Sequence, residues 1–154
     1  MTRLPILDMK FSIITADSRQ VKPGALFMAY PGVHNDGRNY IAQAIQAGAA
    51  AVIWENGDFA WNADWQVANI GIAGLKDKVG EIAADYYGQP SQKMRMIGVT
   101  GTNGKTSVSQ WIAQALTAVG QKTAVIGTIG NGFVGAQQEA RNTTPDAILL
   151  HGML

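Results

Sequence analysis

Apolar residues in the first half of the chain fall into short runs that alternate with helical stripes. Three runs, at 26–30, 50–54 and 67–72, have the length and composition of buried strands. Stripes with helical spacing cover 40–47 and 75–87. A strand, a helix and another strand in this order are typical of a crossover between parallel strands. The pattern predicts an α/β domain.

The segment 55–65 interrupts this alternation with a polar stretch that contains aromatic residues. We expect these aromatic side chains to tuck against the domain. Tryptophans are more often packing residues than a platform for stacked bases, and this is the role predicted for all four: Trp54, Trp61, Trp65 and Trp111.

Residues 88–93 combine Gly, Pro and Ser after the second helix and offer nothing apolar to bury, which is typical of a linker. We therefore predict a boundary near residue 90, with one small domain over 1–90 and the start of a second over 91–154.

The second region repeats the alternation, and we expect it to be unfinished at Leu154. Its predicted elements are a strand at 94–99, a helix at 106–119 whose apolar stripe is core, a strand at 123–128, a turn at Asn131–Gly132 and a last helix opened by Thr144, Pro145 and Asp146.

Composition excludes several classes of function. The chain has 154 residues, is 47% hydrophobic and 15% charged, and carries a formal net charge of +1, so it lacks the basic excess expected for binding nucleic acid or anionic membrane. It has no cysteine and two histidines, which excludes thiol catalysis and a histidine-rich metal site. Because no apolar run reaches the roughly 18 residues of a membrane span, we expect a cytoplasmic protein. Nothing in the pattern indicates an oligomeric state.

The sharpest chemical feature lies between the strand predicted at 94–99 and the helix that follows it. The residues are Gly101, Thr102, Asn103, Gly104, Lys105, Thr106 and Ser107. Glycines expose backbone N–H groups to a phosphate, and a helix N-terminus adds partial positive charge. Lys105 would be the cation for the outer phosphates, and the Thr106 hydroxyl would be a magnesium ligand. Val99 stands where the full P-loop pattern has its first glycine, so this is a shortened variant.

This loop has two other interpretations. A plain glycine turn between strand and helix does not account for a lysine followed directly by Thr106 and Ser107. A dinucleotide-binding loop would have the pattern G-x-G-x-x-G, which is absent.

The sequence resembles the Mur ligases, the amide-forming enzymes of peptidoglycan precursor synthesis. Gly98–Ser107 is similar to the ATP-binding loop of that family. Two further stretches are similar to the branch that makes the UDP-N-acetylmuramoyl-tripeptide: Asp17–Arg19 with Val21–Ala29, and Gly127–Gly132 with Asn142–Asp146. Together they span nearly the whole chain in the family's order.

The resemblance implies an ATP-dependent ligase that adds a diamino acid, meso-diaminopimelate or lysine, to UDP-N-acetylmuramoyl-L-alanyl-D-glutamate through an acyl phosphate. Gly101 to Ser107 would hold ATP and Mg²⁺, with Lys105 as the catalytic cation. The positions that match uridine contacts are Ala16, Ser18, Val33, His34 and Asn35. Those that match contacts to the muramoyl-dipeptide are Asn142, Thr143 and Thr144. Because the family uses further domains, we expect no ligation by these 154 residues alone.

Simpler roles and other functions stay open at this stage. Asp17–Arg19 alone fits a polar turn, His34 fits a solvated loop residue, and Thr143 and Thr144 fit helix capping. The whole protein could be another ligase of the superfamily, such as a folylpolyglutamate-type or cyanophycin ligase, which would not bind uridine nucleotides. It could also be a non-catalytic nucleotide-binding module.

Overall fold

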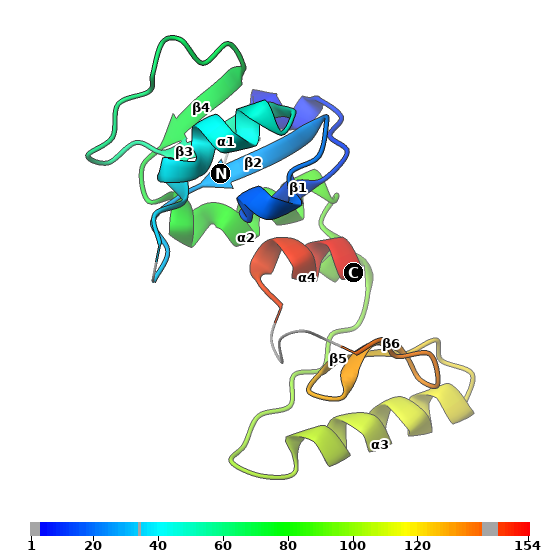
Figure 1. Cartoon of the computed structure of the whole chain (residues 1–154). Helices are drawn as coiled ribbons and strands as arrows, with labels where there is room; N and C mark the ends of the chain where they lie inside the picture. Colours follow the sequence, from blue (N-terminus) through cyan, green and yellow to red (C-terminus); the bar gives the residue numbers. More distant parts are fainter. Residues whose placement is uncertain (1–3, 34, 140–144) are drawn as a thin grey trace. The chain divides into compact units, whose positions relative to one another are not determined.

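The computed structural model describes residues 4–33, 35–139 and 145–154. Its contacts divide the chain into two compact units (Figure 1). The first unit contains 4–94 together with Ala147–Leu154, and the second contains Arg95–Asp146.

The first unit is built on a parallel sheet with the strand order β1-β2-β3-β4. The strands are β1 (Ile14–Thr15), β2 (Ala25–Ala29), β3 (Ala49–Glu55) and β4 (Ala68–Ile72). The parallel pairing of β2 with β3 confirms the predicted crossover and the α/β class. Only β1 was not predicted, because a two-residue strand leaves no period for a sequence pattern to show.

Helices cover both faces of this sheet (Figure 1). The described helices of this unit are α1 (Ile41–Gln46), α2 (Leu75–Tyr86) and α4 (Ala147–Met153) and the short 3₁₀ helices η1 (Pro5–Asp8), η2 (Ser18–Gln20), η3 (Gly37–Tyr40) and η4 (Pro90–Lys93). Side chains alternate along β2, so Leu26 and Met28 pack in a cluster with α2, whereas Phe27 packs in a second cluster with Ile41 of α1. Burial on both faces fits the composition of the central strands: β2 is apolar throughout, and β3 is apolar up to its last residue, Glu55.

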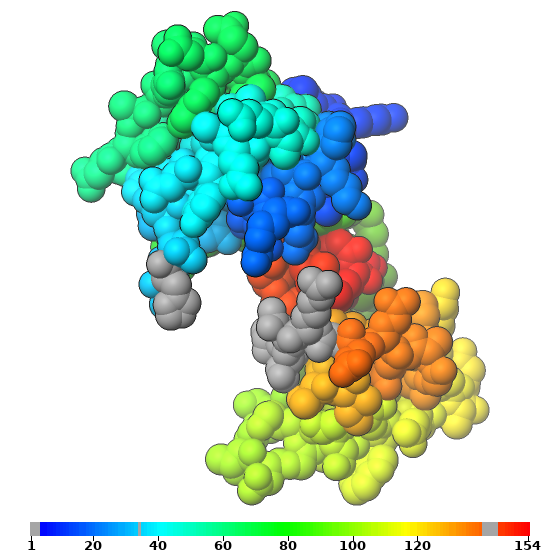
Figure 2. Space-filling model, in the orientation of Figure 1, coloured from blue at the N-terminus to red at the C-terminus, as the bar shows by residue number. Residues whose placement is uncertain are grey.

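The connection from β3 to β4 contributes to the face that carries α1. Phe59, Trp61 and Trp65 pack, partly buried, against the cluster that contains Ile41, which confirms the predicted tucking. The Trp61 and Trp65 ring centroids are 4.9 Å apart with the rings edge to face. Figure 2 shows the atoms of this connection, in green, beside the cyan atoms of α1. An aromatic loop thus covers sheet surface next to a short helix.

The second unit consists of α3 (Lys105–Ala118) and an antiparallel hairpin of β5 (Ala124–Gly127) and β6 (Gly130–Phe133). The strand predicted at 94–99 is wrong: these residues form no strand and are largely exposed. A strand needs a neighbour to accept its hydrogen bonds, and β5 and β6 pair with each other. The turn predicted at Asn131–Gly132 is also wrong, because both residues lie within β6 and the hairpin turns at 128–129.

The apolar stripe of α3 was predicted to be core, and the structure contradicts this. Trp111 is 67% exposed and Val119 is 73% exposed, while Ala113 is the buried residue of the helix. In the part of this unit that the structure describes, one helix packs on one hairpin. That arrangement leaves the opposite face of the helix without cover.

Two segments near the ends of the second region have contacts with the first unit. Pro90, in the segment predicted as a linker, is buried in η4. Helix α4 begins at Ala147, so Pro145 precedes it rather than opening it, and Ile148 is buried in the cluster that contains α2. Contacts with α2 therefore group α4 with 4–94. Among the described helices, none has the length and apolarity to cross a membrane.

Candidate functional site

The glycine-containing loop directly precedes α3. Helix α3 begins at Lys105, and Gly104 before it has φ +78°, a left-handed conformation that glycine adopts without strain. Thr102 and Asn103 are exposed at the tip of the loop. Because α3 is 14 residues long, its first backbone N–H groups carry the partial positive charge of the helix dipole.

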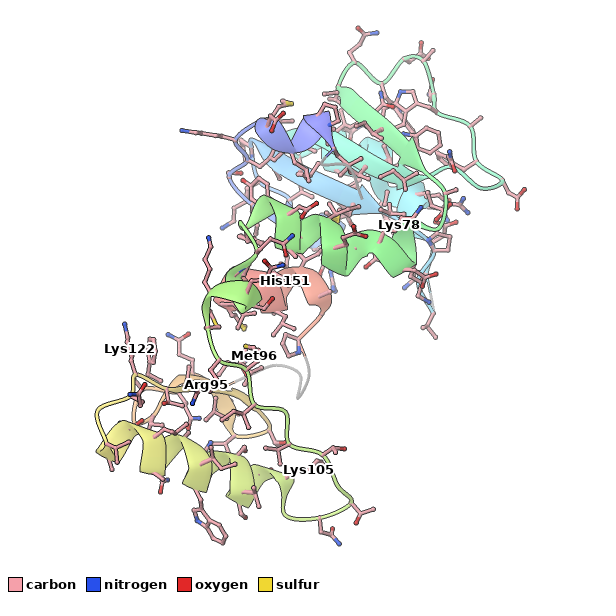
Figure 3. All side chains as sticks on the ribbon, turned by 180° about the vertical axis from the view of Figure 1, so that it is seen from behind. Lys78, Arg95, Met96, Lys105, Lys122 and His151 are labelled. Carbon is pink, nitrogen blue, oxygen red and sulfur yellow. The ribbon has the colours of Figure 1, made fainter. Side chains whose placement is uncertain are left out.

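Lys105 folds back over this loop. Its ammonium group donates hydrogen bonds to the backbone oxygens of Gly101 and Thr102, the latter at 3.3 Å. Figure 3 shows Lys105 at the start of α3. Within the described residues, the backbone N–H groups of 101–104 donate to no protein acceptor. The loop therefore presents an ammonium and free N–H donors side by side, a set that fits a phosphate group.

The remaining predicted residues of the loop are Thr106, which is half-buried, and Ser107, which is exposed; both lie in the first turn of α3. The described residues contain no group of three or more His, Asp or Glu that could hold a metal ion by itself.

In the first unit, four predicted residues follow the carboxyl ends of neighbouring strands. Ala16 and Ser18 follow β1, and Val33 and Asn35 follow β2. Ligands of open parallel sheets bind outside this edge. Val33 is 83% exposed, and Asn35 is exposed beside it. These four positions therefore share one edge of the sheet.

A capping aspartate paired with an arginine two residues later follows both β1 and β2. After β1, Asp17 caps η2 by accepting from the Arg19 N–H at 3.0 Å, and it also binds the Arg19 guanidinium at 2.8 Å. After β2, Asp36 caps η3 by accepting from the Arg38 N–H at 2.9 Å, and it binds that guanidinium at 2.7 Å. The hydrogen bond from the neighbouring arginine holds the pKa of each aspartate below its ordinary value of 3.8.

The two pairs differ in their surroundings. The Arg19 side chain is 84% exposed, whereas that of Arg38 is 12% exposed. Arg38 lies over the Phe59 ring, 5.2 Å from its centroid, and donates to the backbone oxygen of Gly57. The second pair therefore joins the turn after β2 to the connection after β3.

Glu55, the last residue of β3, caps α2 from a distance. Its carboxylate accepts from the N–H groups of Leu75 at 2.6 Å, Gly74 at 3.0 Å and Gly57 at 3.3 Å. Burial raises the pKa of this carboxyl, but the three backbone hydrogen bonds outweigh burial and leave the pKa below 4.5. Gly74, the N-cap residue of α2, has no side chain that could accept these hydrogen bonds.

The structure groups the predicted residues in two places. Gly101 to Ser107 form one continuous loop and first turn, and Ala16, Ser18, Val33 and Asn35 lie at one sheet edge. His34, Asn142, Thr143 and Thr144 lie outside the described residues. Sequence reasoning missed Arg38 and Glu55. The repeated Asp-x-Arg spacing after two strands was a visible signal for Arg38. No local sequence pattern indicated the capping role of Glu55.

Comparison with protein families gives two matches. The model described as the Mur ligase family, catalytic domain, matches residues 10–87, and that of the Mur ligase middle domain matches 99–154. Among relatives, UDP-N-acetylmuramoyl-L-alanyl-D-glutamate–2,6-diaminopimelate ligase of Nitrosomonas europaea is 50% identical over 148 residues, 96% of this chain and 28% of the relative. The protein of the same name from Chromobacterium violaceum is 46% identical over 96% of this chain and 30% of its own length.

Solved structures agree with these matches. A structure of a UDP-N-acetylmuramoyl-L-alanyl-D-glutamate–2,6-diaminopimelate ligase superposes with a TM-score of 0.72 at 32% identity, over 95% of this chain and 29% of that one. The UDP-N-acetylmuramoylalanyl-D-glutamyl-2,6-diaminopimelate–D-alanyl-D-alanyl ligase of Acinetobacter baumannii superposes with a TM-score of 0.58 at 25% identity, over 72% of this chain and 24% of that one. The chain thus spans less than a third of the length of these relatives.

Proposed function

The chain belongs to the Mur ligase family, and from this premise we propose that it forms the uridine-nucleotide and ATP-phosphate sites of an ATP-dependent ligase. The reaction proposed for the ligase is the addition of 2,6-diaminopimelate to UDP-N-acetylmuramoyl-L-alanyl-D-glutamate. The observation that carries this proposal is 50% identity over 148 residues to a ligase of that name, because it runs through both units in order. The same observation favours diaminopimelate over lysine as the amino acid added.

The ATP site would be the loop before α3. Bound ATP supplies the phosphoryl group that activates the substrate carboxylate for attack by an amine. The free N–H groups of 101–104 would hold phosphate oxygens, and Lys105 would exchange its bonds to the Gly101 and Thr102 carbonyls for bonds to phosphate. Thr106 would give its hydroxyl to Mg²⁺, whose other ligands would include phosphate oxygens and water.

The substrate site would begin at the carboxyl edge of the first unit. Ala16, Ser18, Val33 and Asn35 lie where open sheets bind nucleotides, and we assign them to the uridine nucleotide. His34 is proposed for the same site. Asn142, Thr143 and Thr144 are proposed to contact the muramoyl-dipeptide.

Calorimetric titration of the 154-residue chain with ATP–Mg²⁺ and with UDP tests both sites. We expect Lys105→Ala to weaken ATP binding by about tenfold or more, because it removes a charge-assisted phosphate contact, and to leave UDP binding within about twofold. Lys122→Ala is the matched control, since it removes the same charge beyond the other end of α3 (Figure 3). Equal losses in both variants would reject the loop as the ATP site. Absence of UDP binding would favour a ligase with a different substrate.

A second measurement concerns turnover. Because the chain spans 28% of the length of its Nitrosomonas relative, we expect no phosphate release when these 154 residues meet ATP, the muramoyl-dipeptide substrate and diaminopimelate. Sustained release above the rate of a Lys105→Ala control would contradict this expectation and would place the whole catalytic machinery within these residues.

A further inference from the structure

The turn after β2 is held closed at its base. Pro31 and Asp36 form an isolated antiparallel bridge, and the Gly32 N–H donates to the Asn35 carbonyl at 2.8 Å. The Gly37 N–H donates to the Tyr30 carbonyl at 3.0 Å, and a Cβ at position 37 would lie 2.9 Å from that same oxygen. Only glycine fits so close an approach. The result is a short turn closed at its base, on which Val33 and Asn35 are exposed.

Arg38 is the residue that connects this turn to another part of the sheet edge. Its guanidinium binds both oxygens of Asp36, at 2.7 Å and 3.0 Å, and reaches the Gly57 carbonyl and the Phe59 ring beyond β3. Phe59 is itself packed on Trp54 and Trp65, with ring centroids 5.8 and 6.4 Å away. The base of the turn is thereby attached to a packed aromatic cluster.

The charges around Arg38 indicate a structural partner rather than an anion receptor. Asp36 binds it directly, and Glu55 and Asp58 also lie within range of its charge. With its side chain 12% exposed and carboxylates around it, the guanidinium is already neutralised and has little surface to offer a phosphate. Arg19 makes the same bond to its aspartate but stays 84% exposed, so burial is specific to the second pair.

We propose that Arg38 is a positioning residue for the uridine nucleotide: it holds residues 31–33 and 35–36 of this turn in their binding geometry by linking Asp36 to Phe59 and the Gly57 carbonyl. This inference rests on the proposed function, which assigns Val33 and Asn35 to that nucleotide. Phe59 lies in the connection between β3 and β4, whereas the turn follows β2. Phe59 therefore affects nucleotide binding indirectly, through its contact with Arg38. A lysine cannot replace Arg38, because an ammonium lacks the planar fork that binds one carboxylate, one carbonyl and one ring face together.

The test is a double-mutant cycle on UDP affinity, measured by calorimetry with the whole chain. We expect Arg38→Lys to weaken UDP binding about tenfold and Phe59→Leu several-fold, with the double variant no weaker than Arg38→Lys alone, because both changes break one linkage. Trp65→Leu is the control: it damages the same cluster, 6.4 Å from Phe59, without a contact to Arg38. It should lower the melting temperature and leave UDP affinity within about twofold.

A second measurement needs no ligand. In NMR spectra of the free chain, Phe59→Leu should shift the amide resonances of Gly32, Val33 and Asn35, whereas Trp65→Leu should not. Unchanged turn resonances, additive losses of affinity, or equal losses for Phe59→Leu and Trp65→Leu would each overturn the positioning role. Failure of the unaltered chain to bind UDP would instead reject the proposed function, and the positioning role with it.

Discussion

At the scale of single residues, Glu55 shows how a strand end can organise a helix start. Gly74 begins α2 without a side chain that could accept from the first N–H groups, so those donors turn to the carboxylate at the end of β3. A capping carboxylate satisfies donors and opposes the positive end of the helix dipole. Glu55 therefore links the sheet edge, where the nucleotide is proposed to bind, to the helix that packs beneath it.

We expect Glu55→Gln to lower the free energy of unfolding by about 1 kcal/mol at pH 7, the usual magnitude of an N-cap. The pKa of Glu55 is lowered in the folded chain, so the carboxylate stabilises the fold fully above its unfolded pKa near 4.5 and this contribution is lost as the pH falls through the lowered value. The difference between the variant and the unaltered chain should shrink over that range in urea titrations. Asp77→Asn, which removes a first-turn carboxylate but no bond to Gly74 or Leu75, is the control, and an equal loss there would contradict the capping role.

Local patterns predicted those site residues whose role depends on neighbours in the chain. Gly104 and Lys105 could be placed because loop and helix start are contiguous. The Asp-x-Arg spacing could have indicated the pairing of Arg38 with Asp36, but not its contacts with Gly57 and Phe59, because these residues come from the connection beyond the next strand. No spacing within the sequence encodes that distance.

At the scale of elements, α2 and α3 show what hydrophobic periodicity can and cannot establish. Both carry an apolar stripe, and both are helices close to the predicted bounds. Ile82 of α2 is 1% exposed, whereas Trp111 of α3 is 67% exposed. Periodicity thus identifies a helix and its apolar face, but a buried face also needs another element to cover it. Residues 94–99 give the same lesson for strands, since their composition fits a strand but none of the described strands pairs with them.

This contrast predicts opposite results for two substitutions. Ile82→Ala should lower the free energy of unfolding by about 2–5 kcal/mol, because it leaves a cavity among Leu75, Val79 and the sheet. Trp111→Gln should change it by less than about 0.5 kcal/mol, because the indole is mostly in water already. Chemical denaturation followed by far-ultraviolet circular dichroism measures both. A large loss for Trp111→Gln would mean that the stripe of α3 is covered in solution.

At the scale of the molecule, apolar burial is distributed unevenly between the two units. The first has two clusters, one on each face of the sheet, with Leu26, Phe27 and Ile41 fully buried. In the second, Ala113 and Val125 are the buried apolar residues among those described. Since local stability follows buried apolar contact, the units should differ in how readily their backbones open.

Amide hydrogen exchange measured by mass spectrometry should therefore show two regimes. Peptides from β2 and β3 should exchange slowly, near the rate of global unfolding, because their strands are central and buried on both faces. Peptides from α3 and the β5–β6 hairpin should exchange orders of magnitude faster, because few buried side chains shield their hydrogen bonds from water.

Added ATP–Mg²⁺ should slow exchange at the start of α3, where Lys105 and the free N–H groups lie. Lys105→Ala should remove that effect while leaving the slow peptides of β2 and β3 unchanged. Equal protection of α3 and β3 without ligand would contradict the difference in burial, and ATP protection that survives Lys105→Ala would contradict the assignment of the loop.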